Sequence, residues 1–378
     1  MNKKVKILFC VLYIASSLIA CKNIDSDNIQ VVTMISKDEK INSDTYLNAY
    51  HLIQLDCPNS ESVINGINGI LCTDENMVIV DSKSNKLLLF GKDGKFIKST
   101  SSMIGHGHNE YVTLADASIN TDARQIYAIS RFPSKLMIFD YDLNLIDCHE
   151  YDNLRATEIV NDGKYLYYLQ QNEEQTRYEL LCQEIADLDI EPRLTKAFDL
   201  PVAQLFTFGR SMTQTDACRL SITFNDTIYR LESGELIPDI KVEFGDNWFS
   251  YNENMSIGDF QRLNSDKYWA IKNICASDST IIFSTNKTGA YIIDIKTGSG
   301  VAYFGFYNKR VPFLSDFMIP VQGRPNSIVY GIIDSNIESF METVQESNMD
   351  FSLNQDILQC IEDFEVSKNP FVVLWDLK

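Results

Sequence analysis

The sequence predicts an all-β fold, a single six-bladed β-propeller, on the basis of three observations. Apolar strand segments near the start of the chain recur at one fixed offset. Short strands and polar turns then alternate along residues 51–334, which divide into six units of about 47 residues, the length of a four-stranded blade. Finally, 45% of the residues are hydrophobic, with 3 Trp, 18 Tyr and 21 Phe, which excludes a disordered chain.

The first two units carry the clearest repeat. Three consecutive strands recur at an offset of 49 residues (126 − 77, 135 − 86 and 145 − 96). One offset kept over three strands indicates two copies of one supersecondary unit, whereas a two-sheet sandwich has no reason for such a period. The aligned segments are Met77–Asp81 with Ile126–Ser130, Lys86–Phe90 with Lys135–Phe139, and Phe96-Ile97 with Leu145-Ile146.

Fainter copies follow, and two terminal segments are expected to close the ring. The strands expected in units three to six are Lys164–Leu169, Tyr178–Cys182, Leu220–Phe224, Thr227–Leu231, Ile240–Phe244, Thr280–Phe283, Ala290–Asp294 and Ser327–Ile333. Closure requires a strand from one end of the chain to complete a blade begun at the other, and His51–Leu55 and Phe371–Trp375 are the candidates. The propeller is therefore predicted over residues 47–378.

Residues 335–365 depart from the strand pattern. Ile337, Phe340, Met341 and Val344 lie at the i, i+3, i+4, i+7 spacing of a helical face. This spacing predicts a small helical insertion before the C-terminal closing strand.

The N-terminal segment predicts export. Three lysines precede an uncharged, mostly apolar stretch over residues 7–20, which is too short to span a bilayer and is typical of a signal peptide. It ends in Leu18-Ile19-Ala20-Cys21, which resembles a bacterial lipobox. We therefore expect a signal peptide over residues 1–20, lipid attachment at Cys21, and a flexible acidic tether over residues 21–46.

Charge and cysteine content restrict the function classes. A formal net charge of −19 argues against nucleic-acid partners, because phosphate backbones require a basic face. After the signal peptide and Cys21, seven cysteines remain, and none are spaced C-x-x-C. They lie in or beside apolar runs, so we expect buried thiols rather than a disulfide framework or a zinc ribbon. They are Cys57, Cys72, Cys148, Cys182, Cys218, Cys275 and Cys360.

Three motifs resemble the six-bladed β-propeller lipoproteins of Bacteroidetes, which are NHL/TolB-like propellers. The motifs are Asp93–Lys98 followed by Gly105–Tyr111, Phe224–Leu231, and Asn369–Leu374. The resemblance covers residues 47–378 and the lipobox, with His108-Asn109 replacing the family's Pro-Gly. It implies an outer-membrane lipoprotein on the periplasmic or cell-surface side, anchored by its lipid, with an outer-membrane protein or a glycan as partner. It implies little about activity.

The loop over residues 105–111 contains one group of candidate binding residues. His106 and His108 suggest a metal pair, but in the family pattern these positions form a turn, so we expect a solvated or partner-facing loop and no metal. Glu110 and Tyr111 match the family motif where the chain crosses to the next blade, and they are candidate contacts. The alternative is structural, with Glu110 accepting backbone N–H bonds and Tyr111 packing between blades.

A second candidate site is aromatic. Trp248, Phe249 and Tyr251 lie in the loop between units four and five, where exposed rings would stack on sugars. The alternative for these three residues is packing between blades.

No motif predicts catalysis or a cofactor. The sequence lacks G-x-S-x-G, H-E-x-x-H and a P-loop. Asp140-x-Asp142-x-Asn144 resembles the start of a calcium loop, but Leu145 occupies the required glycine position, so a hairpin turn is expected. We therefore expect a binding module for a protein or glycan. The alternative is a lactonase-like or glycan-directed hydrolase or lyase with a carboxylate or metal site in the central channel.

Overall fold

The computed structural model describes residues 29–48, 50–202, 208–252, 255–308, 318–324, 327–332, 359 and 369–378. The described chain is mostly β, and its α-helix of defined bounds is the short α2 (Ile257–Leu263). Within these residues no helix is both long enough and apolar enough to cross a membrane. The predicted signal peptide, Cys21 and the helical insertion at 335–365 lie outside the described residues, apart from residue 359.

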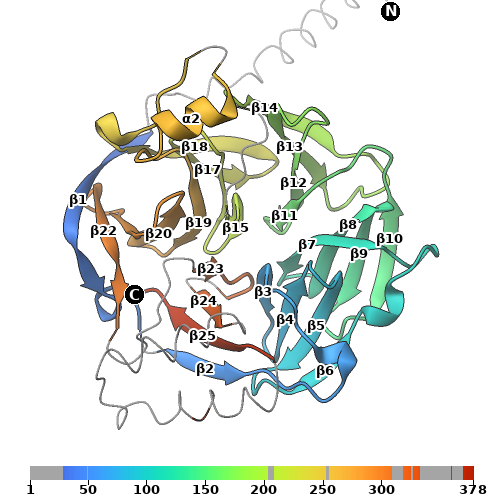
Figure 1. Cartoon of the computed structure of the whole chain (residues 1–378). Coiled ribbons are helices and arrows are strands. Elements are labelled where there is room, and N and C mark those ends of the chain that lie inside the picture. Colours follow the sequence, from blue (N-terminus) through green and yellow to red (C-terminus); the bar gives the residue numbers. More distant parts are fainter. Residues whose placement is uncertain are drawn as a thin grey trace, which may run out of the picture.

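The strands form sheets arranged around a ring (Figure 1). The first sheet contains β3 (Gly69–Cys72), β4 (Asn76–Asp81), β5 (Lys86–Gly91) and β6 (Phe96–Ser99). The second contains β7 (Thr113–Asn120), β8 (Gln125–Phe132), β9 (Ser134–Asp140) and β10 (Leu145–Glu150). The third contains β11 (Glu158–Asn161), β12 (Tyr165–Gln171), β13 (Arg177–Glu184) and β14 (Arg193–Asp199). Neighbouring strands in each of these sheets are antiparallel.

Two further groups of four strands follow in the chain. The fourth group is β15 (Met212–Gln214), β16 (Cys218–Ser221), β17 (Thr227–Glu232) and β18 (Glu235–Glu243). The fifth is β19 (Ile271–Ala276), β20 (Thr280–Thr285), β21 (Ala290–Asp294) and β22 (Ser299–Tyr307). Strand β1 (Gln30–Asn42) joins these two groups into one nine-stranded sheet.

Strand β1 corrects the predicted tether. The flexible tether is predicted over residues 21–46, but residues 30–42 within it pair in parallel first with β18 and then with β22 (Figure 1). Val32 and Met34 point into the core, while most of the strand is exposed. The polar composition that suggests a tether is the outward face of an outer strand, and it covers two sheet edges that would otherwise present unpaired N–H and C=O groups.

The predicted ring closure is confirmed. In the sixth group, β23 (Ile319–Pro320), β24 (Ser327–Ile332) and β25 (Phe371–Asp376) are completed by β2 (His51–Gln54) from the other end of the chain. The β2–β25 pairing is antiparallel, with Ile53 opposite Val372. The 49-residue repeat is also confirmed, because β4 and β8 begin at residues 76 and 125 and β6 and β10 at 96 and 145, while β5 and β9 begin at 86 and 134, within one residue of the same offset.

The first strands of the six groups contact one another in a closed circuit, from β3 through β7, β11, β15, β19 and β23 back to β3. Clusters of buried apolar side chains lie between each group and the next, and one of them packs Val372 and Leu374 against Ile79 to return to the first sheet. The fold is therefore propeller-like, with its core divided among the sheet-to-sheet contacts.

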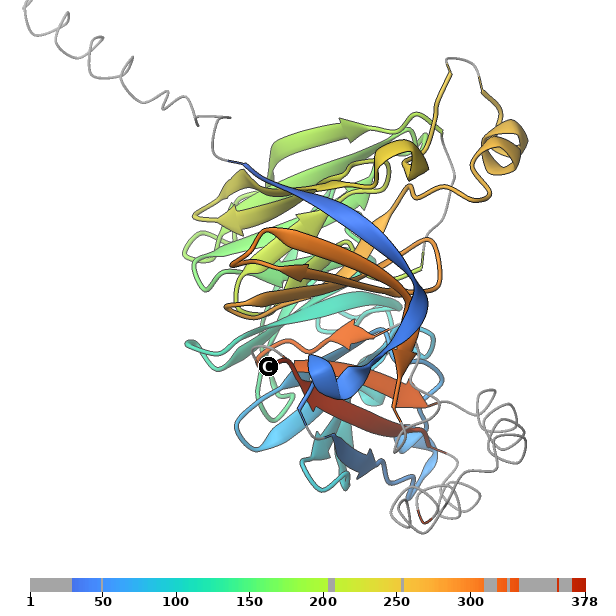
Figure 2. The same ribbon diagram turned by 90° about the vertical axis from the view of Figure 1, so that its left-hand side faces the viewer.

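The ring has two faces that differ in their connections. First and third strands run in one direction and second and fourth strands in the other, so loops from a fourth strand to the next first strand gather at one end. This α2 face carries α2 and residues 100–112. The opposite C-terminal face carries the hairpins between first and second strands and the C-terminus, which follows a third strand. In Figure 2, α2 lies far to the right, whereas the C-terminus and the start of β1 lie to the left.

Candidate functional site

The predicted binding loop at 105–111 is exposed at its tip and buried at its end. His106 and His108 are exposed, and both lie on the α2 face. Tyr111 is 1% exposed, and its hydroxyl lies 2.5 Å from the hydroxyl of Thr100. Burial raises the pKa of Tyr111 to about 12. Tyr111 therefore anchors the loop and is not available to a ligand.

Glu110 shapes this loop from within. Its Oε2 accepts a hydrogen bond from the Gly107 N–H at 2.7 Å. A Cβ at Gly105 would lie 2.1 Å from the same oxygen, so a side chain there would displace the carboxylate. The glycines of the motif thus make room for the carboxylate that closes the turn.

Lys135, a buried lysine on β9, donates hydrogen bonds to the backbone of this loop. Lys135 Nζ donates to the carbonyl oxygens of Gly107, His108 and Glu110 at 3.1, 2.6 and 3.2 Å. It also lies 3.1 Å from Glu150 Oε1. These charge-assisted bonds fix the loop backbone and leave the two histidine side chains in solvent.

Sequence reasoning missed the role of Lys135, although a signal was present. The 49-residue repeat aligns Lys135 with Lys86, and each lysine is followed directly by four apolar residues of its strand. Lys86 is also buried, and its Nζ donates to the Glu61 carbonyl at 2.8 Å. A lysine recurring at the start of a buried strand indicates a cation that satisfies loop carbonyls.

The predicted aromatic site is mainly packed. Trp248 stacks on Phe244 with ring centroids 5.4 Å apart, and Phe249 lies 5.1 Å from Phe224. Of the three predicted residues only Tyr251 is exposed. The loop therefore presents one ring on the α2 face, and its other two rings support the fold.

A buried ion pair links β7 to the residue two positions before β15. Asp116 on β7 accepts bonds from both terminal nitrogens of Arg210, at 2.7 and 2.5 Å, and also from the Ile159 N–H at 2.9 Å. Both side chains are almost fully buried. Burial would lower the pKa of Arg210, but the Asp116 carboxylate outweighs burial and raises it above the ordinary value. The pair ties β7, β11 and the start of β15 together.

The Glu158 carboxylate also forms hydrogen bonds within the protein. Glu158 accepts the N–H groups of Ser211 and Met212 at 3.0 and 2.7 Å. The fully buried Lys272 donates to Ser211 Oγ at 2.5 Å. Burial lowers the pKa of Lys272 to about 8, although the Glu158 charge opposes this shift. Asp116 and Glu158 thus hold inner strands together.

Among the described residues there is no group of three or more His, Cys, Asp or Glu side chains that could hold a metal.

The segment that resembles the start of a calcium loop is a hairpin turn, as predicted. Asp140 Oδ1 accepts the N–H groups of Asp142 and Asn144 at 2.9 and 2.8 Å. Six of the seven cysteines are described, and none of these six forms a disulfide: Cys182, Cys218 and Cys275 are buried, and Cys57, Cys72 and Cys148 are half-buried.

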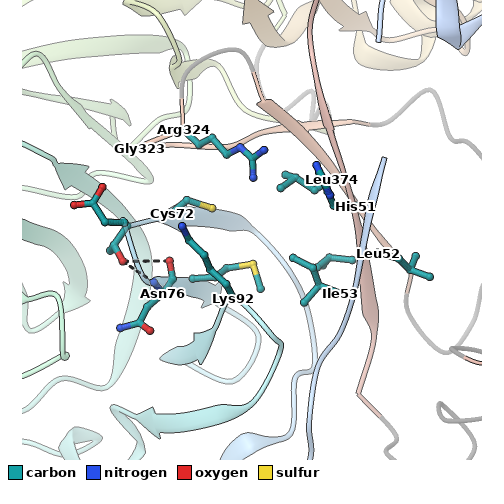
Figure 3. Close-up of a pocket in the computed structure, with 13 residues that line it drawn as sticks. His51, Leu52, Ile53, Cys72, Asn76, Lys92, Gly323, Arg324 and Leu374 are labelled. Carbon is teal, nitrogen blue, oxygen red and sulfur yellow. Dashed lines mark hydrogen bonds between the residues drawn. The ribbon is translucent and has the colours of Figure 1, made fainter. Parts of the chain in front are cut away.

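A cavity of about 660 Å³ opens where the ring closes, between the sheet of β2 and β25 and the sheet of β3 and β4 (Figure 3). We call it the seam cavity. Its lining includes Leu52 and Ile53 from β2, and Lys92 from the turn after β5. It lies on the C-terminal face, and it was not anticipated, because its walls come from opposite ends of the chain.

Basic side chains reach into the seam cavity. Figure 3 shows Lys92 and Arg324 extending from opposite walls toward Cys72. Burial raises the pKa of the Cys72 thiol to about 11, although the charges of Arg324 and Lys92 oppose this shift. The thiol is therefore neutral at physiological pH and cannot balance the two cations.

A family model described as a domain of unknown function, DUF4934, matches residues 26–376. No curated protein matches the chain.

Similar folds occur among solved structures. A Bacteroides fragilis NCTC 9343 protein that is predicted to be exported aligns with a TM-score of 0.66 and 12% identity, over 92% of this chain and 99% of that one. BamB of Moraxella catarrhalis aligns at a TM-score of 0.40 and 11% identity, over 67% and 66% of the two chains. A streptogramin B lyase aligns at 0.40 and 14%, over 68% and 73%. The first similarity shows a shared fold alone.

Proposed function

The chain belongs to the DUF4934 family, and from this premise we propose that it is a lipid-anchored, six-bladed propeller of the outer membrane. In this proposal it binds a protein or glycan through its α2 face and catalyses no reaction. Six blades are supported by the six groups of four strands, two of which β1 bridges at their outer edges. The six apolar clusters between successive groups give the same number.

The observation that carries the proposed function is the preformed loop on the α2 face. Its backbone is held by Lys135 and Glu110, while His106 and His108 remain exposed. A loop that is already ordered loses little conformational entropy when it binds a partner. Such an arrangement suits recognition of a large ligand that lies across the face.

The orientation of the proposed binding face follows from the proposed anchor. Nine peptide units separate Cys21 from the start of β1 at Gln30 (30 − 21), which span at most about 30 Å. Because β1 starts on the C-terminal side in Figure 2, a lipid at Cys21 would turn that face to the bilayer and the α2 face away from it.

Replacing Cys21 with alanine tests the anchor. We expect the Cys21→Ala protein to move from the membrane fraction to the soluble fraction of the cell envelope, because an anionic bilayer repels a protein with a formal net charge of −19. Lys22→Ala is the matched control, since it changes the neighbouring residue and leaves the thiol in place. Full membrane retention of Cys21→Ala would rule out the lipid anchor.

The absence of catalysis is tested by turnover. Asp116 is paired with Arg210 and Glu158 with backbone N–H groups, which counts against either as a general acid or base. We therefore expect the purified protein to release no product from panels of glycans and lactones. Product formation that is abolished by a chelator or by Asp116→Asn, in a variant that remains folded, would establish the hydrolase or lyase alternative instead.

A further inference from the structure

We propose that the seam cavity binds a small amphipathic anion, a molecule with one carboxylate or phosphate group and a short apolar chain. This inference does not rest on the proposed function, because the seam cavity lies on the opposite face from the loop at 105–111. Its volume of about 660 Å³ is within the range of small-molecule sites, roughly 300–1,000 Å³.

The charge of the lining points to an anion. The chain as a whole carries a formal net charge of −19, yet the seam cavity is lined by Lys92, Arg324 and His51 and by a single acid, Asp74. The basic groups attract anions to the seam cavity, whereas the acidic residues over the rest of the protein repel them.

The two permanent cations keep bonding capacity for a ligand. Among the described residues, Lys92 makes no hydrogen bond or ion pair. Arg324 contacts Asp376 at 2.9 Å through one terminal nitrogen, and the other donors of its five-donor guanidinium are not used within the described chain. Lys92 and Arg324 face each other across the opening (Figure 3), so one anionic group can bridge them.

The rest of the lining favours an apolar chain on that anion. Ile53, Met77, Val372 and Leu374 line the cavity and belong to one apolar cluster, and the protonated thiol of Cys72 also belongs to the lining. In Figure 3, Ile53 points from β2 toward the side on which Lys92 lies, below Leu374 of β25, whereas Leu52 points to the other side of β2. A short alkyl or aryl group would cover Ile53 and Leu374 while its acid group meets Lys92 and Arg324.

Calorimetric titration of the full chain carrying Cys21→Ala with decanoate tests the proposal. The neutral decanamide is the matched control ligand. We expect decanoate to bind and decanamide to bind at least about tenfold more weakly. Lys92→Gln is expected to weaken decanoate binding by about tenfold, the lower end for a charge-assisted hydrogen bond. Because Lys92 makes no bond in the described chain, thermal unfolding should be unchanged. Lys196→Gln, which removes one exposed charge from β14, is the matched control.

A free molecule and an acidic lipid can both carry an acid group on an apolar chain. A second experiment therefore measures how much protein sediments with phosphatidylcholine vesicles that contain or lack phosphatidylglycerol. Lys92-dependent binding of decanoate alone assigns a free ligand, and Lys92-dependent sedimentation with the acidic vesicles assigns a lipid. The proposal is overturned if neither arm shows binding that Lys92→Gln weakens. It is equally overturned if Lys196→Gln causes the same loss.

Discussion

Arg210→Met is expected to destabilise the protein by about 3–5 kcal/mol, the usual cost of leaving a buried charge without its partner. Asp116 would keep the Ile159 N–H bond but lose both bonds to the guanidinium. Its side chain is only 2% exposed, so water cannot replace them. Urea unfolding followed by intrinsic fluorescence measures the change in the free energy of unfolding.

A control variant and a double variant show whether the unpaired charge causes this loss of stability. Arg262→Met removes an arginine that pairs with Asp259 on the exposed face of α2, and it should leave the free energy of unfolding nearly unchanged. Asp116→Leu combined with Arg210→Met should recover much of the loss, because no unpaired charge remains buried. A cost below about 1 kcal/mol for Arg210→Met alone would contradict the structural role of the pair.

Lys272→Met is expected to stabilise the protein, in contrast to Arg210→Met. Burial lowers the pKa of Lys272 from its ordinary value of 10.5 to about 8, so below pH 8 the folded protein contains an ammonium group that it disfavours. One pKa unit corresponds to about 1.4 kcal/mol, so this penalty is on the order of 3 kcal/mol. After allowing about 1 kcal/mol for the lost bond to Ser211, the variant should be about 2 kcal/mol more stable at pH 7.

The pH dependence separates this explanation from simple packing. Between pH 8 and 10.5 the unfolded chain binds more protons at Lys272 than the folded chain, so the penalty in the natural protein falls as pH rises. The advantage of Lys272→Met should therefore shrink across this window, and above it only the cost of about 1 kcal/mol for the lost bond to Ser211 should remain. Lys196→Met, at an exposed position, should show no such trend. An advantage that is constant from pH 7 to pH 10.5 would refute the electrostatic origin.

The parts of the fold that could be predicted are those with a local pattern. The 49-residue offset is visible because Lys86–Phe90 and Lys135–Phe139 keep the same apolar order within single strands. Ring closure could be predicted because His51–Leu55 and Phe371–Trp375 are apolar segments at the two ends that no other unit uses. Buried strands reveal themselves through their own composition.

The parts that could not be predicted depend on distant partners. Strand β1 is largely exposed and charged, and its pairing with β18 and β22 joins residues more than 200 positions apart, as in Gln30 with Ile240. Asp116 and Arg210 are separated by 94 residues, and neither lies in a motif. The seam cavity likewise requires β2 and β25 to meet. For a related reason, the sequence of the 105–111 loop does not distinguish the buried Tyr111 from the exposed His108.

Site-specific photo-crosslinking in intact cells tests the central proposal, that the α2 face holds the ligand. A benzophenone amino acid would replace either the exposed His108 on the α2 face or the exposed Lys296 in the hairpin between β21 and β22 on the C-terminal face. We expect one discrete crosslinked species from position 108 and none from position 296. Equal crosslinking from both positions, or crosslinking from position 296 alone, would contradict the proposed binding face.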